Sequence, residues 1–279
     1  MSSGAILGAG PIGSAIAHRL AERARIGEIR LIDEAGAIAA GKALDIRQAG
    51  PVDGYDTSIV GTTDLLSAAG ADVIVFADPI ADGEWEGERG LALVQRLVRA
   101  GTSATFVFAG PKQTSLMEAA AREGRVPNDR LIGTAAATLP HTVAALLHVE
   151  TGLAGAAVSV TGRPPSFVVA WSAGTIGGRL VTEVVPAHRL HAISQSLGKL
   201  WPPGPQAIAA PTAAVVEGLV AGARQPITAS VITDGEFGVR GVAAMMPIEL
   251  GNKRILKRAL PTQTPQERTE TMSVLSRRS

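Results

Sequence analysis

The residues with the clearest chemical potential form a glycine-rich turn near the amino terminus, followed by Asp33 twenty residues after the last glycine. Glycines at this spacing permit a tight strand-to-helix turn, close approach to a pyrophosphate and close helix packing, and the helix N-terminus binds the anion. A carboxylate at Asp33 can accept hydrogen bonds from a ribose and would repel the 2′-phosphate of NADP. The predicted NAD-type dinucleotide site comprises Gly8, Gly10, Pro11, Ile12, Gly13 and Asp33. The alternative is a glycine-rich turn that binds nothing.

Composition narrows the classes of function. The 279 residues include 26 basic and 25 acidic ones, so no excess of positive charge favours nucleic acid as a partner. We also expect no membrane partner, because the chain has no basic amphipathic stretch and no apolar run near the ~18 residues of a membrane-spanning helix. The chain has no cysteine, which excludes disulfides, thiolate catalysis and cysteine-ligated metals. With no leader-like amino terminus, a cytoplasmic location is expected.

The first half of the chain alternates apolar runs with helical patterns, as parallel α/β folds do. The predicted strands are Ala5–Leu7, Ile29–Ile32, Thr57–Val60, Val73–Phe76, Thr105–Phe108 and Arg130–Ile132. The predicted helices are Ile12–Arg23, Ala35–Ala49, Leu91–Ala100 and Ser115–Glu123. Several of the strands are apolar on both faces, which indicates helices on both sides of the sheet. The pattern predicts a Rossmann-type doubly wound parallel sheet.

A different pattern begins after residue 142 and predicts a second, α+β domain. The expected division is 1–142 for the dinucleotide-binding domain and 143–279 for the carboxyl-terminal domain. Its predicted elements are strands at 156–160 and 167–171, helices at 184–200, 212–220 and 264–275, a hairpin turn at Asp234-Gly235 and a strand at 247–250.

The order of short motifs along nearly the whole chain resembles the lactate/malate dehydrogenase family, most closely its malate dehydrogenase-like branch. The segments that carry the resemblance are 41–45 (GKALD), 61–64 (GTTD), 131–134 (LIGT), 209–213 (AAPTA), 235–242 (GEFGVRGV), 247–251 (PIELG), 260–262 (LPT) and 264–268 (TPQER). The resemblance implies an NAD-dependent oxidoreductase with a substrate domain at its carboxyl terminus. It also implies a homo-oligomer, a dimer or tetramer, and the small-residue-rich helix near 36–49 could pack against a partner or against its own sheet.

The catalytic residues that the resemblance implies are replaced. The family transfers a proton with a His–Asp pair and clamps the substrate carboxylate with arginines. Arg163 occupies the His position, Leu139 the Asp position and Thr142 that of a carboxylate-binding Arg. A guanidinium stays protonated near pH 7 and cannot act as a base. His141 is the only titratable group near these positions; it is a weak catalytic candidate or simply a histidine at a helix N-terminus.

The loop over the family's site is acidic here. Residues 78–89 hold five acids and one arginine; Asp82 replaces the first loop arginine, and Arg89 matches the second to within a residue or two. Asp78 lies where a negative charge would oppose a pyrophosphate, and Gly110 replaces an Asn near the nicotinamide. His188 and His191 share a helix without a third ligand, so no metal site is expected. We predict that Arg163 pairs with Asp78 or Asp82 and closes the site.

Three hypotheses follow. The first is a catalytically degenerate dehydrogenase-like protein, a pseudoenzyme that binds NAD. The second is an active NAD-dependent oxidoreductase with an altered substrate, in which Arg163 anchors an anion. The third is a non-catalytic oligomeric interaction protein with a vestigial dinucleotide site.

Overall fold

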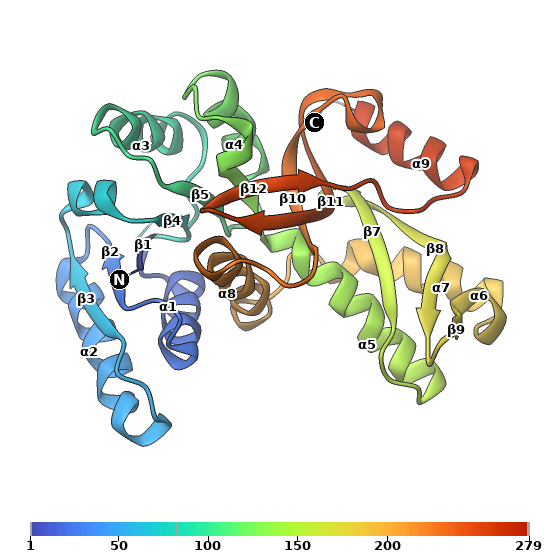
Figure 1. Ribbon diagram of the computed structural model, residues 1–279, viewed down its shortest axis with the longest axis horizontal. Coiled ribbons are helices and arrows are strands. Elements are labelled where there is room, and N and C mark those ends of the chain that lie inside the picture. Colours follow the sequence, from blue (N-terminus) through green and yellow to red (C-terminus); the bar gives the residue numbers. More distant parts are fainter. Residues whose placement is uncertain (1, 82, 278–279) are drawn as a thin grey trace.

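Parallel strands form the amino-terminal part of the sheet in the computed structural model, which describes residues 2–81 and 83–277 (Figure 1). Their spatial order is β3-β2-β1-β4-β5-β6. The order reverses between β1 and β4, which opens a crevice at the carboxyl ends of these two strands. The bounds are β1 Ser3–Leu7, β2 Glu28–Ile32, β3 Ser58–Thr62, β4 Val73–Phe76, β5 Thr105–Phe108 and β6 Leu131–Gly133.

Helices cover both faces of these strands. One buried cluster joins the sheet to α1, α2 and α8, and a second joins its other face to α3 and α4. The amino-terminal helices are α1 Pro11–Arg23, α2 Gly36–Asp53, α3 Gly87–Arg99 and α4 Thr114–Arg122, with 3-10 turns at Leu65–Gly70, Asn128–Arg130 and Ala135–Thr138. The predicted doubly wound α/β fold is confirmed.

The sheet continues into the second part of the chain, because β10 pairs antiparallel with β6. Beyond β10 the order is β11-β7-β8-β9, and β12 pairs with β11. The strands are β7 Ala157–Arg163, β8 Ser166–Ile176, β9 Arg179–Leu180, β10 Ile227–Asp234, β11 Arg240–Gly251 and β12 Arg254–Arg258. The helices are α5 Leu139–Thr151, α6 Val181–Val184, α7 Ala187–Leu197, α8 Pro205–Ala221 and α9 Pro265–Ser276, with 3-10 turns at Gly198–Leu200 and Glu236–Gly238.

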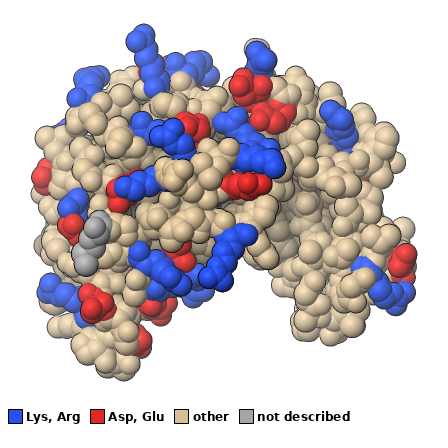
Figure 2. Space-filling view, viewed as in Figure 1, with Lys and Arg blue, Asp and Glu red and all other residues tan. Residues whose placement is uncertain are grey.

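The two parts of the molecule are joined where β10 pairs with β6, and Figure 2 shows a notch between their outer ends. The expected boundary after residue 142 falls inside α5, so the domain division stays a prediction. On the face shown, Lys, Arg, Asp and Glu side chains lie mainly on the larger, left-hand part of the molecule, with blue and red intermixed. Among the helices described, none combines the length and the apolar character needed to cross a membrane.

The strands predicted at 167–171 and 247–250 are parts of the longer strands β8 and β11, and two predicted helices also differ from the structure. The helix predicted at 184–200 is divided into α6 and α7, because Val185 is extended ahead of Pro186, as a residue before proline prefers. The helix predicted at 212–220 begins earlier, with Pro205 in its first turn, and it runs through Pro211. A proline removes one helical hydrogen bond, and burial of Pro211 in the core offsets that cost.

Helix α9 is fixed to β8 by one carboxylate. Thr264 and Glu267 form a reciprocal capping box at the start of α9. The Glu267 carboxylate also accepts hydrogen bonds from the Ser172 backbone N–H at 3.0 Å and from its hydroxyl at 2.6 Å. Burial opposes ionisation of Glu267, but the hydrogen bonds from Ser172 and Thr264 outweigh burial and lower its pKa below 4.5.

We expect Glu267→Gln to lower the free energy of unfolding by about 1–2 kcal/mol at pH 7, because the cap and the Ser172 contact both weaken. The folded-state pKa is depressed, so this stabilisation is complete above pH 4.5 and disappears as the pH falls through the lower folded-state pKa. Urea unfolding at several pH values measures it. Glu270→Gln, at an exposed carboxylate of the same helix, is the control. A difference between wild type and Glu267→Gln that is independent of pH would contradict this account.

Candidate functional site

The glycine-rich turn has the predicted strand–turn–helix geometry. Gly8 has a φ of +111°, which favours glycine, and Gly10 is the N-cap of α1. A Cβ at Gly13 would lie 2.0 Å from the Gly8 carbonyl oxygen, so only glycine lets the helix approach the strand end this closely. The turn therefore brings the N-terminus of α1 to the crevice between β1 and β4.

The carboxylate of Asp78 lies on that helix N-terminus. Its Oδ2 accepts a hydrogen bond from the Ile12 N–H at 3.1 Å, and its Oδ1 accepts one from the Gly13 N–H at 2.8 Å. The Asp78 side chain comes from the end of β4 and is buried, with 8% of the residue exposed. Backbone N–H groups at this position are the ones that hold an anion in dinucleotide-binding turns. Here an internal carboxylate already binds them.

Asp78 also uses the space that the glycines leave. A Cβ at Gly8 would lie 2.4 Å from the Asp78 carbonyl carbon, and one at Gly10 would lie 2.5 Å from the Asp78 Cγ. The Gly10 N–H donates to the Asp78 carbonyl at 2.7 Å. Burial raises the pKa of Asp78, while the N–H groups of Gly13 and Ile12 and the charge of Lys42 favour the ionised carboxylate.

Asp33 is also engaged by the protein's own backbone. Its Oδ2 accepts hydrogen bonds from the N–H groups of Ala9 at 2.8 Å and Ile80 at 3.0 Å. Its Oδ1 accepts from the Ala35 N–H at 2.9 Å, and only 4% of the residue is exposed. The bond to Ile80 places the loop after β4 against the carboxylate that was predicted to bind a ribose.

The same loop reaches the far side of the crevice through Glu84. The Glu84 carboxylate accepts a hydrogen bond from the Lys112 N–H at 2.8 Å, and a Cβ at Gly110 would lie 2.0 Å from its Oε2. Burial raises the pKa of Glu84. The Trp85 indole N–H donates to the Leu7 carbonyl at 2.9 Å, at the end of β1. Glu84 thus fills space at the position where the family's Asn was expected.

Arg89 packs on Trp85 of this loop. Its guanidinium lies 4.5 Å from the centre of the Trp85 ring and 3.7 Å from the Glu34 carboxylate. Asp82, the other acid expected on the lid, lies outside the described residues.

These contacts bear on whether the NAD implied by the family resemblance fits this site. A pyrophosphate at the N-terminus of α1 would need the Ile12 and Gly13 N–H groups that Asp78 already binds. In this arrangement the residues present do not fit a pyrophosphate. An open pocket of ≈ 260 Å³ lies beside Asp33 at the carboxyl ends of β1–β3. Its lining is mostly apolar: Leu7, Ile32, Asp33, Glu34, Thr63, Leu65, Trp85, Arg89, Ala92, Leu93 and Arg96.

Arg163, at the end of β7, pairs with Glu118 of α4. Its Nη2 lies 2.9 Å from the Glu118 Oε2, and both side chains are largely buried. The other carboxylate oxygen of Glu118 accepts a hydrogen bond from the Ala243 N–H at 2.9 Å. The predicted pair between Arg163 and Asp78 is wrong, because Asp78 caps α1 and Arg163 turns to a nearer buried carboxylate.

The other residues considered for catalysis or metal binding lie on α5 and α7. Leu139 is 2% exposed within the hydrophobic cluster of α5, β7 and α7. Thr142 donates its hydroxyl proton to the Thr138 carbonyl at 3.1 Å. His141 is exposed at the first turn of α5, and His188 and His191 are exposed on α7.

One group among the described residues has possible metal-ligand spacing. His18 and Glu22 of α1 and Asp53 of α2 each offer a ligand atom, and these atoms lie within 4.8 Å of one another. Glu22 and Asp53 are exposed, and the group lies outside the crevice between β1 and β4.

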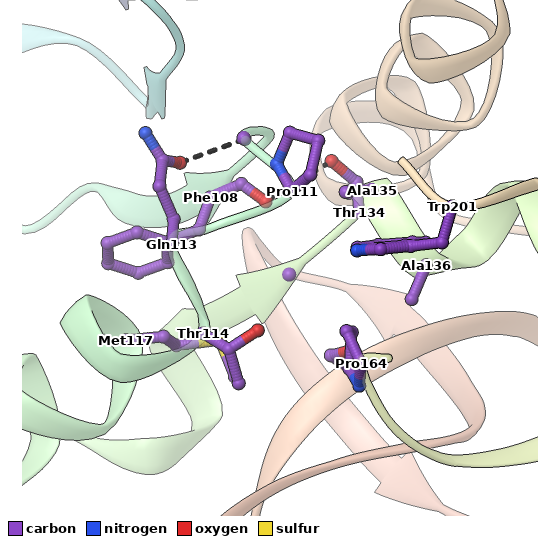
Figure 3. Close-up of a pocket in the computed structure, with 13 residues that line it drawn as sticks. Phe108, Pro111, Gln113, Thr114, Met117, Thr134, Ala135, Ala136, Pro164 and Trp201 are labelled. Carbon is purple, nitrogen blue, oxygen red and sulfur yellow. Dashed lines mark hydrogen bonds between the residues drawn. The ribbon is translucent and has the colours of Figure 1, made fainter. Parts of the chain in front are cut away.

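The pocket between the two parts of the chain holds no ionisable side chain. Figure 3 shows Pro164 and Trp201 on one side of it and Thr114 and Met117 on the other. It is lined by Phe108, Gly110, Pro111, Gln113, Thr114, Met117, Gly133, Thr134, Ala135, Ala136, Pro164, Trp201 and Ser230. Its free volume of ≈ 10 Å³ is about enough for one water molecule. The pocket beside Arg163 therefore offers no charge to a carboxylate and no room for it.

Glu118 and Glu84 were missed by the reasoning from sequence. Glu118 lies between apolar residues on a helix predicted to pack against the sheet, and that placement could have marked it as a buried acid in need of a cation. Glu84 was recognised only as one member of an acidic loop. Nothing in its local pattern indicated that it would be buried against Gly110.

Known proteins resemble the chain over almost its full length. No protein-family model matches it. The malate dehydrogenase of Thermomicrobium roseum is 29% identical over 88% of this chain and 86% of its own. The malate dehydrogenase of Cytophaga hutchinsonii is 28% identical over 90% of this chain and 88% of its own.

Solved structures share the fold. The minor L-lactate dehydrogenase of Enterococcus mundtii superposes with a TM-score of 0.87 at 17% identity, over 99% of this chain and 95% of its own. The malate dehydrogenase of Salinibacter ruber has a TM-score of 0.85 at 19% identity, and the superposition covers 98% of this chain and 93% of that structure's chain. Similarity over the whole chain, with the same order of motifs and the same sheet, leads to one conclusion: the chain belongs to the lactate/malate dehydrogenase family.

Proposed function

We propose that this chain is a catalytically degenerate member of its family, a dehydrogenase-like protein that does not interconvert 2-hydroxy and 2-oxo acids, and that it acts in the cytoplasm. The observation that carries the proposal is the Arg163–Glu118 pair at the position of the proton relay. A group that is permanently protonated and bound to a carboxylate cannot exchange a proton with a substrate hydroxyl.

The surroundings of Arg163 support the same conclusion. Leu139 lies in the core where an orienting carboxylate would be needed, and Thr142 is engaged with the backbone of its own helix. The neighbouring pocket has no cation among its lining residues and almost no free volume. We therefore expect that this site can neither transfer a proton nor bind a substrate carboxylate, and that it has no room for a substrate.

The same ion pair argues against one of the two other functions considered for this chain. An active enzyme in which Arg163 anchors an anionic substrate would need a guanidinium free to bind that anion. Glu118 already neutralises it, at 2.9 Å. A non-catalytic interaction protein with a vestigial dinucleotide site is the second candidate, and the Asp78 carboxylate on α1 favours it.

Two exposed apolar side chains on α2 support self-association in either case. Ala39, Ala43 and Ile46 are buried, while Ile38 and Leu44 are 48% and 43% exposed. We propose that a second copy of this chain covers this exposed surface of α2, as the expected homo-oligomer requires.

The first test is turnover. We expect NADH oxidation with pyruvate or oxaloacetate to remain at background, at least roughly 10⁴-fold below a typical kcat of about 10 s⁻¹. Arg163→His is expected to stay inactive, since Leu139 and Thr142 are unchanged. The Thermomicrobium roseum relative assayed in parallel is the positive control. Saturable turnover of any hydroxy or oxo acid by the wild-type protein would overturn the proposal.

A double-mutant cycle tests the role of Arg163. Arg163→Met and Glu118→Gln, alone and together, are expected to show a coupling of about 1–3 kcal/mol in urea unfolding, because each leaves the other's buried polar group without its partner. The exposed pair Arg122–Glu123 is the control, with an expected coupling below about 1 kcal/mol. No measurable coupling between Arg163 and Glu118 would contradict a structural role and restore the hypothesis of an anion anchor.

Self-association is tested by light scattering after size exclusion. We expect the wild-type protein to be a dimer or larger and Leu44→Glu to be a monomer with an unchanged circular dichroism spectrum, because a charge would be buried at the interface. Val149→Glu, at an exposed site on α5, should leave the assembly intact. A monomeric wild-type protein would refute the homo-oligomer.

A further inference from the structure

The N-terminus of α1 already has an anion bound to it, supplied by the chain. The two oxygens of Asp78 accept separate N–H groups, from Ile12 and Gly13, at 3.1 and 2.8 Å. This two-point contact on a helix N-terminus reproduces what one phosphate group of a dinucleotide would make. Lys42, whose ammonium group donates to the Ala9 carbonyl, adds a positive charge that favours the ionised carboxylate.

We propose that Asp78 is a specificity-determining residue: its carboxylate occupies the anion position of the glycine-rich turn and excludes ligands that carry a pyrophosphate. An entering phosphate would have to displace the carboxylate from both N–H groups or share them with a like charge a few ångströms away. The inference goes beyond the proposed loss of catalysis, because binding of a dinucleotide does not depend on the proton relay.

The obstacle to a pyrophosphate at this helix N-terminus is the Asp78 side chain alone. The backbone of the loop is held independently, by the Gly10–Asp78 carbonyl bond, by Ile80 on Asp33 and by the Trp85 indole on Leu7. The neighbouring pocket of ≈ 260 Å³ beside Asp33 is open. Removing the carboxylate alone therefore frees the N–H groups of α1 and leaves the surrounding loop contacts in place.

The test compares NADH binding by wild type, Asp78→Ala and Asp78→Asn in fluorescence titrations up to about 1 mM cofactor. Asp78→Ala should bind NADH at least roughly tenfold more tightly than wild type, since one charged helix cap no longer competes. Asp78→Asn, which keeps an acceptor but loses the charge, should lie between them. Asp72→Ala is the matched control. Asp72 lies just before β4, whereas Asp78 lies just after it, and the Asp72 carboxylate also accepts a hydrogen bond from a backbone N–H, that of Ser3.

A second readout uses inorganic pyrophosphate, which should raise the thermal unfolding temperature of Asp78→Ala and not that of wild type. Equal NADH affinity of wild type and Asp78→Ala, whether tight or undetectable, overturns the proposal. If Asp78→Ala does not fold, as judged by circular dichroism, the comparison of wild type with Asp78→Asn decides it in the same way. Turnover plays no part in this experiment, so its failure is distinct from failure of the proposed loss of catalysis.

Discussion

A helix N-terminus presents backbone N–H groups that have no partner within the helix. In the crevice of this protein, the central interaction is the one that supplies hydrogen-bond acceptors to these groups. Asp78 does so for α1, and it can because it follows β4, next to the strand that leads into the helix. The loop after β4 has its own contacts with the sheet edge: the Ile80 N–H binds Asp33, and the Glu84 carboxylate lies against Gly110. Groups of the chain itself therefore fill the crevice around the helix N-terminus.

The ion pair between Arg163 and Glu118 connects the two parts of the molecule in a similar way. Arg163 ends β7 and Glu118 lies on α4, so the pair joins a strand of the second part to a helix of the first. A buried guanidinium and a buried carboxylate are each costly to leave alone. Arg163 therefore makes a structural contact between the two parts of the molecule, within a fold shared with solved lactate and malate dehydrogenases.

Local patterns were sufficient for most of the fold. The parallel strands were predicted nearly to the residue, because strands buried on both faces read as short apolar runs between turn signals. The glycine-rich turn was also predicted, since few sequences meet its steric demands. The passage of α8 through Pro211 was not predicted, because the surrounding core determines whether a proline inside a helix is tolerated. The division of α6 from α7 was also missed, although Pro186 is a local signal for it.

The sequence by itself determined the family and the order of the strands' apolar runs, since these depend on residue type and spacing. Only the tertiary structure decided which charges meet. Arg163 was expected to pair with Asp78 or Asp82, yet Asp78 and Arg163 each contact a group brought near by the folding of distant segments: α1 for Asp78 and Glu118 for Arg163. Electrostatic partners depend on distance and burial in three dimensions, and neither quantity is encoded in the local pattern around a single residue.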